Sequence, residues 1–316
     1  MALVNKLTAI GDAIRNKNGS TGKLTLDSMV TAINDMASVT IDGVKASGSF
    51  ALTKETAAVL KKLTNFPIST ENYLQAVIFN DEIHAISVQK HYKYNFVDSS
   101  WELVGTNPSE FYEGDAVIYN NEIHFIDGDF HYKYDGVAWT MIKEYSGLGF
   151  GYKSAVAYGN KIHCLGVYDS TYGYKGHYTV DGTTKKFVSA LPFNYSNTDG
   201  IKAVVYNNEI HALHSTGHYK WDGKSWTNVS TIPYNFTFGG AAVFNDEIYI
   251  AGGQSSTDQK KYYKWDGVSW TSLGSFPTYF YQGELFTFNN ILYSVESTYQ
   301  SFYKLRDIYL RGDIND

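Results

Sequence analysis

Histidine is the residue type whose placement in this chain most invites a chemical function. Eight of the nine histidines fall at two recurring positions, one in strands that read E-I-H and one in strands that read H-Y-K or a relative of these. The first set is His84, His124, His163 and His211, and the second is His91, His131, His177 and His218. Imidazole can bind a metal ion or transfer a proton near neutral pH. A metal ion, however, needs three or four ligands that converge on one point, and two histidines in each repeat do not provide them.

Two further observations favour a packing role for these histidines. In the last two repeats, Tyr249, Tyr262 and Tyr293 stand where histidine would. In three repeats the two histidines are seven residues apart, a spacing that predicts neighbours on adjacent strands of a hairpin. The sequence therefore predicts structural histidines that pair with each other, no metal site and no cofactor.

Other residue types point away from several classes of activity. The formal net charge of −6 and the three arginines, Arg15, Arg306 and Arg311, do not suit a nucleic acid, a phosphate or a sialic acid carboxylate. Cys164 lies in the predicted strand KIHCLG, where we expect it to be buried as a small hydrophobic residue. A glycan hydrolase needs two carboxylates about 5 to 10 Å apart, and the sequence does not rank candidates for them. We therefore expect no enzyme, and a glycan hydrolase is left as an alternative.

The elements that carry the histidines form a repeat of about 38 to 48 residues. In each copy an apolar run ends in a two-residue turn, Asn80-Asp81, Asn120-Asn121, Gly159-Asn160, Asn207-Asn208, Asn245-Asp246 or Asn289-Asn290. A second turn, Asp-Gly in four copies, follows the aromatic third strand. Such pairs between β-rich runs are the strongest hairpin signal. Each copy therefore predicts a four-stranded meander, and the period predicts a six-bladed β-propeller.

The regions outside the repeats predict two smaller parts. Leu3, Leu7, Ile10 and Ile14 recur at helical spacing, so residues 1–37 are predicted to form a helical hairpin. Residues 38–56 are predicted to be a linker with one short hairpin, and residues 57–316 the propeller. The segment 57–67 resembles the fourth strands of later repeats, while the last repeat lacks a clear fourth strand of its own. We expect 57–67 to complete the last blade and remove its open edge.

Two resemblances give this organisation a context. The segment LTAIGDAIRNKNGSTGKLTLDSMVTAIND, followed by TIDGVKASGSF, resembles the N-terminal segment of many virion proteins of tailed bacteriophages that infect Gram-positive hosts. In that group, the segment precedes appendage domains. The repeats resemble Kelch propellers in their aliphatic and aromatic strands, although only one repeat carries a Gly-Gly pair after its second strand, at Gly252-Gly253. The resemblance implies a tail, baseplate or other appendage protein with a Kelch-like propeller.

The connections between blades are long and rich in Tyr and Phe, while the opposite face is predicted to carry only two-residue turns. Loops on a rigid scaffold commonly hold binding sites, and tyrosine gives contact area at a low entropic cost. The predicted ligand-binding residues are Phe111, Tyr112, Tyr145, Tyr152, Tyr195, Tyr234, Phe236, Tyr279 and Tyr281. Some of these rings could instead pack between blades or fill the channel.

The expected function is that of a non-enzymatic virion appendage. Its propeller would recognise carbohydrate or protein on the bacterial surface, and its N-terminal module would attach it to other virion proteins, with homo-oligomers as an option. The alternative is a capsid or tail decoration protein whose propeller binds virion proteins. Without a recognisable signal peptide or membrane span, the expected location is the virion, assembled in the host cytoplasm. The triplet Arg311-Gly312-Asp313 matches an adhesion motif, which chance explains better.

The attachment role of the N-terminal module gives a first prediction. Because short isolated helices are marginal in water, their apolar faces must dock on a partner. Changing Leu7 and Ile10 to Asp should release the protein from virions while the propeller still melts at its normal temperature. Immunoblots of purified particles measure this, and incorporation at the wild-type level would place the attachment surface elsewhere.

Overall fold

A computed structural model describes residues 38–41, 44–47, 52–53, 60–67, 73–111, 114–126, 130–145, 154–169, 173–193, 200–296, 298–305 and 311–312. The chain divides into two compact units. One is Val59–Arg306, and the other joins Met1–Ala58 to Asp307–Asp316. The helical hairpin predicted for 1–37, with Leu3, Leu7, Ile10 and Ile14, lies outside the described residues.

The larger unit is an all-β propeller of six four-stranded sheets among the described residues. Blade one holds β5 (Gln75–Phe79), β6 (Glu82–Ile86), β7 (Lys90–Asn95) and β8 (Ser100–Thr106). Blade two holds β9 (Asp115–Tyr119), β10 (Glu122–Ile126), β11 (Phe130–Tyr134) and β12 (Trp139–Glu144). Blade three holds β13 (Ser154–Tyr158), β14 (Lys161–Asp169), β15 (Gly173–Asp181) and β16 (Thr184–Ala190).

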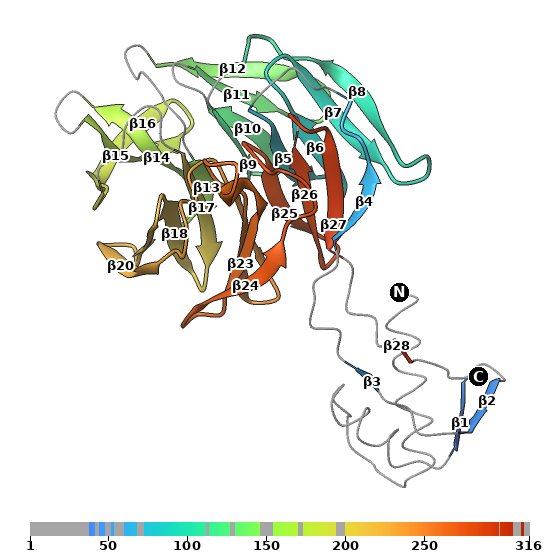
Figure 1. The fold of residues 1–316 in the computed structure, drawn as a ribbon. Coiled ribbons are helices and arrows are strands. Elements are labelled where there is room, and N and C mark those ends of the chain that lie inside the picture. The colour runs from blue at the N-terminus through green and yellow to red at the C-terminus, as the bar shows by residue number, and fades with distance from the viewer. Residues whose placement is uncertain are drawn as a thin grey trace, which may run out of the picture. The chain divides into compact units, whose positions relative to one another are not determined.

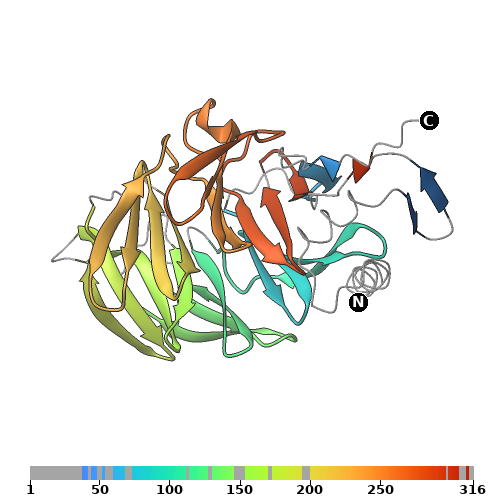
Figure 2. The same ribbon diagram turned by 90° about the horizontal axis from the view of Figure 1, so that it is seen from below.

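Blades four to six repeat this meander. Blade four holds β17 (Ile201–Tyr206), β18 (Glu209–His214), β19 (Gly217–Trp221) and β20 (Trp226–Thr231). Blade five holds β21 (Gly240–Phe244), β22 (Glu247–Ala251), the short 3-10 helix η1 (Asp258–Lys260), β23 (Lys261–Trp265) and β24 (Trp270–Ser275). Blade six holds β25 (Glu284–Phe288), β26 (Ile291–Glu296), β27 (Ser301–Leu305) and β4 (Leu60–Thr64). The first strands of the blades contact one another in sequence around the centre (Figures 1 and 2).

The ring is closed by a strand from the other end of the propeller sequence. Leu60–Thr64 (β4) lies within the segment 57–67 and pairs antiparallel with β27, with Leu60 opposite Leu305. Phe66 follows β4, is fully buried, and contacts Tyr92 and Trp101 of blade one at centroid distances of 5.6 and 5.1 Å. The closing strand therefore completes the sheet of blade six and packs it against blade one.

The smaller unit contains two short pairs of strands. Ser38–Ile41 (β1) and Val44–Ser47 (β2) form an antiparallel hairpin. Leu52–Thr53 (β3) pairs with Arg311–Gly312 (β28), so two residues of the Arg-Gly-Asp triplet form part of a strand. Asp313 lies outside the described residues. In the part of the chain that the structure describes, no helix is long and apolar enough to cross a membrane.

The two predicted kinds of turn differ in geometry. The turns between first and second strands are as predicted: Asn120 and Asn121, for example, have φ of 50° and 59°, the left-handed conformation that asparagine tolerates. Three of the Asp-Gly turns are not two-residue turns. Tyr134 pairs with Trp139, which leaves a four-residue loop in which Asp135 Oδ1 accepts from the backbone N–H groups of Val137 and Ala138 at 2.8 and 3.0 Å. The aspartate side chain replaces a main-chain partner and only the glycine needs positive φ.

The histidines pair as the sequence predicts. In four blades the Nδ1 atom of the second-strand histidine lies 2.8 Å from the Nε2 atom of the third-strand histidine: His84 and His91, His124 and His131, His163 and His177, and His211 and His218. All eight side chains are buried. Since one ring must donate and the other accept, a neutral imidazole on each strand satisfies the bond.

The third-strand histidines also join each blade to the next. His91 contacts Tyr134 and Trp139 of blade two at centroid distances of 4.8 and 5.6 Å. Likewise His177 contacts Trp221 and Trp226, and His218 contacts Trp265 and Trp270. The apolar clusters of the propeller lie at the same joints, between neighbouring blades. The core is therefore a series of interfaces between sheets.

Ring closure gives a prediction about truncation. Deleting residues 1–50 should leave the propeller folded, because it removes no propeller strand. Deleting residues 1–70 removes β4 and Phe66, which exposes the backbone of β27 and an apolar edge. The second truncation should aggregate or lose many degrees of melting temperature in a thermal shift assay. Equal melting of the two proteins would show that β4 is dispensable for closure.

The histidine pairs predict a loss of stability in acid. Burial lowers the pKa of His84 to about 4 and that of His91 to about 3. The unfolded chain, with a histidine pKa near 6.5, then binds protons between pH 6.5 and about 4 that the folded chain does not. Above pH 6.5 the buried neutral histidines therefore leave the free energy of unfolding at its full value. As the pH falls below 6.5, that free energy decreases, in total by about 1.4 kcal/mol for each unit by which the pKa is lowered.

The matched test replaces one pair by the tyrosines that blade five carries at these positions. Changing His84 and His91 to Tyr should leave a folded protein whose melting temperature falls less steeply between pH 7 and pH 4 than that of the wild type. Calorimetry across this pH range measures the slope. An unchanged slope would mean that other groups control the acid sensitivity.

Candidate functional site

A ring of residues at the start of the six innermost strands surrounds one mouth of the propeller. Each lies five positions before the first residue of the turn that ends its strand. The strand pairings make these positions equivalent from blade to blade. The members of this mouth ring are Gln75, Asp115, Ser154, Lys202, Gly240 and Glu284. Gly240 has no room for a side chain, because a Cβ atom would lie 2.9 Å from the Gly283 carbonyl oxygen.

One half of the mouth ring is held together by Asp115. Its Oδ2 atom accepts a hydrogen bond from the Ser154 hydroxyl at 2.9 Å and another from the Ala155 N–H at 2.7 Å. The Ser154 hydroxyl in turn accepts from the Ala203 N–H at 3.0 Å. Asp115 and Ser154 are both buried. This chain of bonds joins blades two, three and four.

The other half contains a buried ion pair. The Lys202 ammonium bonds to Glu284 Oε1, and the two side chains are 15% and 10% exposed. With its amide nitrogen turned towards the carboxylates, Gln75 donates to Asp115 Oδ1 at 2.5 Å and to Glu284 Oε1 at 2.8 Å. Gln75 therefore connects the two halves, and the mouth ring is nearly continuous.

The electrostatics of the pair reflect its burial. Burial raises the pKa of Glu284 to about 7. The nearby Lys202 ammonium lowers this pKa but only partly offsets the effect of burial, and the negative charge of Asp115 raises it further. Burial acts in the opposite direction on Lys202, but the carboxylates of Glu284 and Asp115 outweigh it and raise the pKa of the ammonium. The mouth thus offers an ammonium donor beside a carboxyl group whose pKa burial raises.

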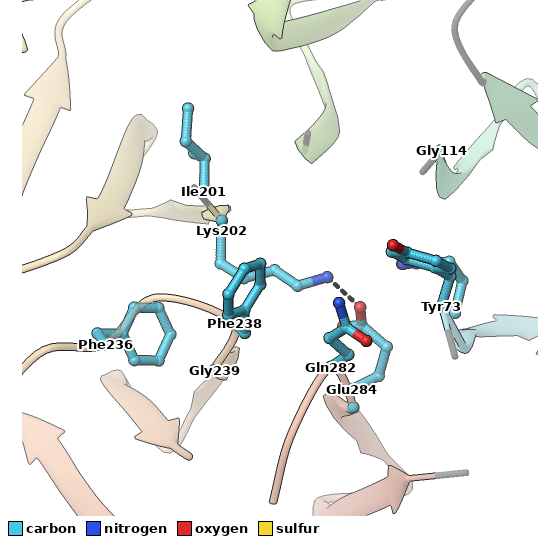
Figure 3. A pocket seen from close by; sticks show the side chains of 12 residues that line it. Tyr73, Gly114, Ile201, Lys202, Phe236, Phe238, Gly239, Gln282 and Glu284 are labelled. Carbon is cyan, nitrogen blue, oxygen red and sulfur yellow. Dashed lines mark hydrogen bonds and ion pairs between the residues drawn. The ribbon is translucent and has the colours of Figure 1, made fainter. Parts of the chain in front are cut away.

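A pocket opens above this ion pair. Its lining combines Lys202, Glu284, Gln75 and Gln282 with Tyr73, Phe236 and Phe238 and with several glycines (Figure 3). The empty space between these residues, which includes space open to solvent, is about 470 Å³. Small-molecule sites usually combine an apolar wall with a few polar groups, as this pocket does.

The backbone of the pocket wall is strained at three positions. Tyr73, Phe238 and Gln282 have φ of 66°, 67° and 54°, and each lies two residues before a mouth-ring position. Positive φ is uncommon for residues other than glycine and is costly for bulky ones. Such strain clusters at binding and catalytic sites. Gln282 donates its N–H to the Phe238 carbonyl at 2.9 Å, which ties two of these segments together.

Four of the nine predicted ligand-binding aromatic residues are buried. Phe111 and Phe236 are each 1% exposed, and Tyr234 and Tyr145 are 7% and 8% exposed. Phe111, for example, stacks on Phe125 at 4.0 Å. Phe111, Tyr145 and Tyr234 therefore cannot offer a ring face to a ligand, whereas Phe236, although almost fully buried, lines the pocket. The loops are rich in aromatic residues because their rings fill the joints between blades.

Two other predicted residues are accessible. Tyr279 is 37% exposed and lies 5.4 Å from Tyr299, which is 43% exposed, while the Lys260 ammonium is 4.6 Å from the Tyr279 ring. Tyr281 is partly buried and packs edge-on at 5.2 Å against Phe238, which lines the pocket. Tyr112, Tyr152 and Tyr195 lie outside the described residues.

The residues of the mouth ring were not predicted as a site from the sequence, although the sequence contains a signal for them. Polar or charged residues at a fixed offset before the Asn/Asp/Gly turns interrupt strands that are otherwise largely apolar, as in QAVIF, DAVIY and ELFTF. Their meeting at one point depends on closure of the ring.

Among the residues that the structure describes, no three His, Cys, Asp or Glu side chains lie together as a metal centre requires. Cys164 is 3% exposed and packs in the cluster between blades two and three.

Comparisons with known proteins support the architecture. No protein-family model matches the sequence, and no curated protein matches it. Among solved structures, that of YjhT aligns with a TM-score of 0.62 and 14% identity over 76% of this chain and 95% of that one. A fungal alcohol oxidase of the AA5 family, in complex with copper, aligns with a TM-score of 0.56 and 12% identity over 78% of this chain and 76% of that one. At these identities the likeness shows the six-bladed propeller fold alone.

Proposed function

We propose that this protein is a non-enzymatic binding protein whose propeller recognises carbohydrate at the mouth pocket. The observation that carries the proposal is the pocket itself, where a buried ion pair and two amides lie beside aromatic rings. Sugars present an apolar ring face and a rim of hydroxyl groups. Aromatic walls with a few fixed polar groups match both features.

The exposed pair Tyr279 and Tyr299 extends this surface beyond the pocket. The Glu296 carboxylate fixes the loop that carries Tyr299, because it accepts from the Thr298 and Tyr299 N–H groups at 2.8 and 2.7 Å. The two rings belong to connections on the same face as the pocket wall. A glycan chain longer than one sugar could therefore be held at two places.

Glycan hydrolysis is the alternative to binding, because two carboxylates, Asp115 and Glu284, lie close together and both accept from the Gln75 amide nitrogen. Because these bonds are 2.5 and 2.8 Å long, the two bonded oxygens lie at or below the lower end of the carboxylate separation that glycosidases use, about 5 Å. Asp115, however, does not line the pocket, and both of its oxygens already accept hydrogen bonds. A carboxylate held in this way serves the structure of the ring and is not presented to a substrate. This arrangement favours binding over catalysis.

The biological setting rests on the N-terminal segment. Its resemblance to virion proteins of tailed bacteriophages supports a role as a virion appendage that recognises the bacterial surface. In this proposal the N-terminal module contacts other virion proteins and the propeller contacts host glycan.

The test uses the full-length protein and an array of bacterial wall and capsular glycans. Changing Phe238, which lines the pocket, and Tyr281, which packs against it, to Ala removes part of the aromatic wall, and each lost ring contact should cost about 1 kcal/mol. Together the two changes should weaken binding about tenfold or more. The matched control is Phe96→Ala, on the opposite face, where Phe96 is 48% exposed.

Glycan binding that the wall variant loses and the control retains supports the proposal. If the protein binds no glycan but binds capsid or tail proteins tightly, the decoration function replaces it. Cleavage of a bound glycan, followed by mass spectrometry, would instead establish a hydrolase.

A further inference from the structure

We propose that the mouth pocket selects a neutral pyranose, with two adjacent hydroxyl groups that bridge Lys202 and Glu284. This inference rests on the carbohydrate-binding function proposed above. It specifies the chemical class of the sugar, which the aromatic wall alone does not decide, because aromatic rings stack on neutral and charged sugars alike.

The balance of charge in the pocket disfavours charged sugars. A uronic acid or sialic acid would bring a carboxylate close to Glu284, with Asp115 behind it. An amino sugar with a free ammonium group would compete with the Lys202 ammonium for the Glu284 carboxylate, because both oxygens of Asp115 already accept hydrogen bonds. Either interaction would be poorly screened, because Lys202 and Glu284 are largely removed from water. A neutral ligand avoids both interactions.

The remaining hydrogen-bonding capacity suits a pair of hydroxyl groups. An ammonium group has three hydrogens, and the bond that the structure describes for Lys202 uses one of them, on Glu284 Oε1. The described bonds to the Glu284 carboxylate all end on Oε1, which leaves Oε2 as an acceptor. One sugar hydroxyl can therefore accept from Lys202 while its neighbour donates to Glu284. Lys202 and Glu284 are in direct contact, so the two hydroxyls that bind them must also lie close together, as adjacent hydroxyls of a pyranose do.

Gln282 supplies a third polar group to the same space. Its Oε1 atom is buried and has no hydrogen-bond partner among the described residues. Its strained backbone holds the side chain in the pocket lining, next to Glu284 (Figure 3). A buried acceptor without a partner is unfavourable, and a ligand hydroxyl would satisfy it. The site therefore offers one strong donor and two acceptors, which matches several hydroxyls of one sugar.

The inference is tested with the full-length protein by titration calorimetry and competition on the glycan array. The neutral probes are methyl glucoside, methyl galactoside and N-acetylglucosamine, and the charged probes are glucuronate and glucosamine. The key variant changes Lys202 to Met and Glu284 to Gln together, because removing one partner alone would leave a buried unpaired charge. A melting curve verifies that this variant is folded.

We expect at least one neutral probe to compete with the glycan, the charged probes to bind at least tenfold more weakly, and the double variant to lose at least tenfold in affinity. A second variant, Gln282→Met, should weaken the same neutral probe about fivefold without a change in melting temperature.

The two proposals fail differently. If the wall variant Phe238→Ala with Tyr281→Ala abolishes glycan binding but the folded double variant binds normally, carbohydrate binding stands and the role of the ion pair is wrong. Tighter binding of a charged probe than of every neutral probe also overturns the inference. If the wild type binds no sugar at all, both proposals fall.

Discussion

Pairing of β4 with β27 is the interaction on which the propeller depends. Each blade covers one face of the next, and the apolar cluster between blades six and one exists only when the six sheets form a closed circle. The joint between blades six and one is made by residues from both ends of the propeller sequence, with Phe66 fully buried beside Tyr94 and Phe302. Closure also removes the unpaired edge that an open blade would expose. The same pairing explains why the chain enters and leaves the propeller at blade six.

Closure also creates the mouth pocket. Six first strands, brought around one centre, place the residue at one register position of each strand into a common ring. Gln75, Lys202 and Glu284 come from blades one, four and six, yet they share one set of charge and hydrogen-bond contacts. The raised pKa of Glu284 follows from this crowding and burial. The positive φ values at Tyr73, Phe238 and Gln282 indicate that the chain accepts local strain in order to shape the wall around these groups.

The repeated histidine pairs show how one residue type can serve packing throughout a fold. In each of four blades the paired rings are buried between two strands, and the third-strand rings of three of these blades press on an aromatic pair of the following blade. Blade five replaces the pair with Tyr249 and Tyr262, whose rings are 6.2 Å apart. A hydrogen-bonded pair of imidazole rings and a pair of phenol rings in contact therefore occupy equivalent positions in their blades. The chemical reactivity of histidine is not needed for this role.

The sequence by itself determined the blade count, the turns at Asn-Asn and Asn-Asp pairs, and the pairing of histidines, because these depend on local periodicity and on residues close in the chain. It also pointed to the segment that contains β4. It misjudged the Asp-Gly loops, where Asp135 side-chain bonds replace the expected turn, and it placed the buried rings of Phe111, Tyr145 and Tyr234 on a ligand-binding surface. Only the tertiary structure decided which aromatic rings fill the joints between blades, since burial depends on the neighbouring blade. The mouth ring likewise required closure, because residues as distant as Gln75 and Glu284 meet only when the circle is complete.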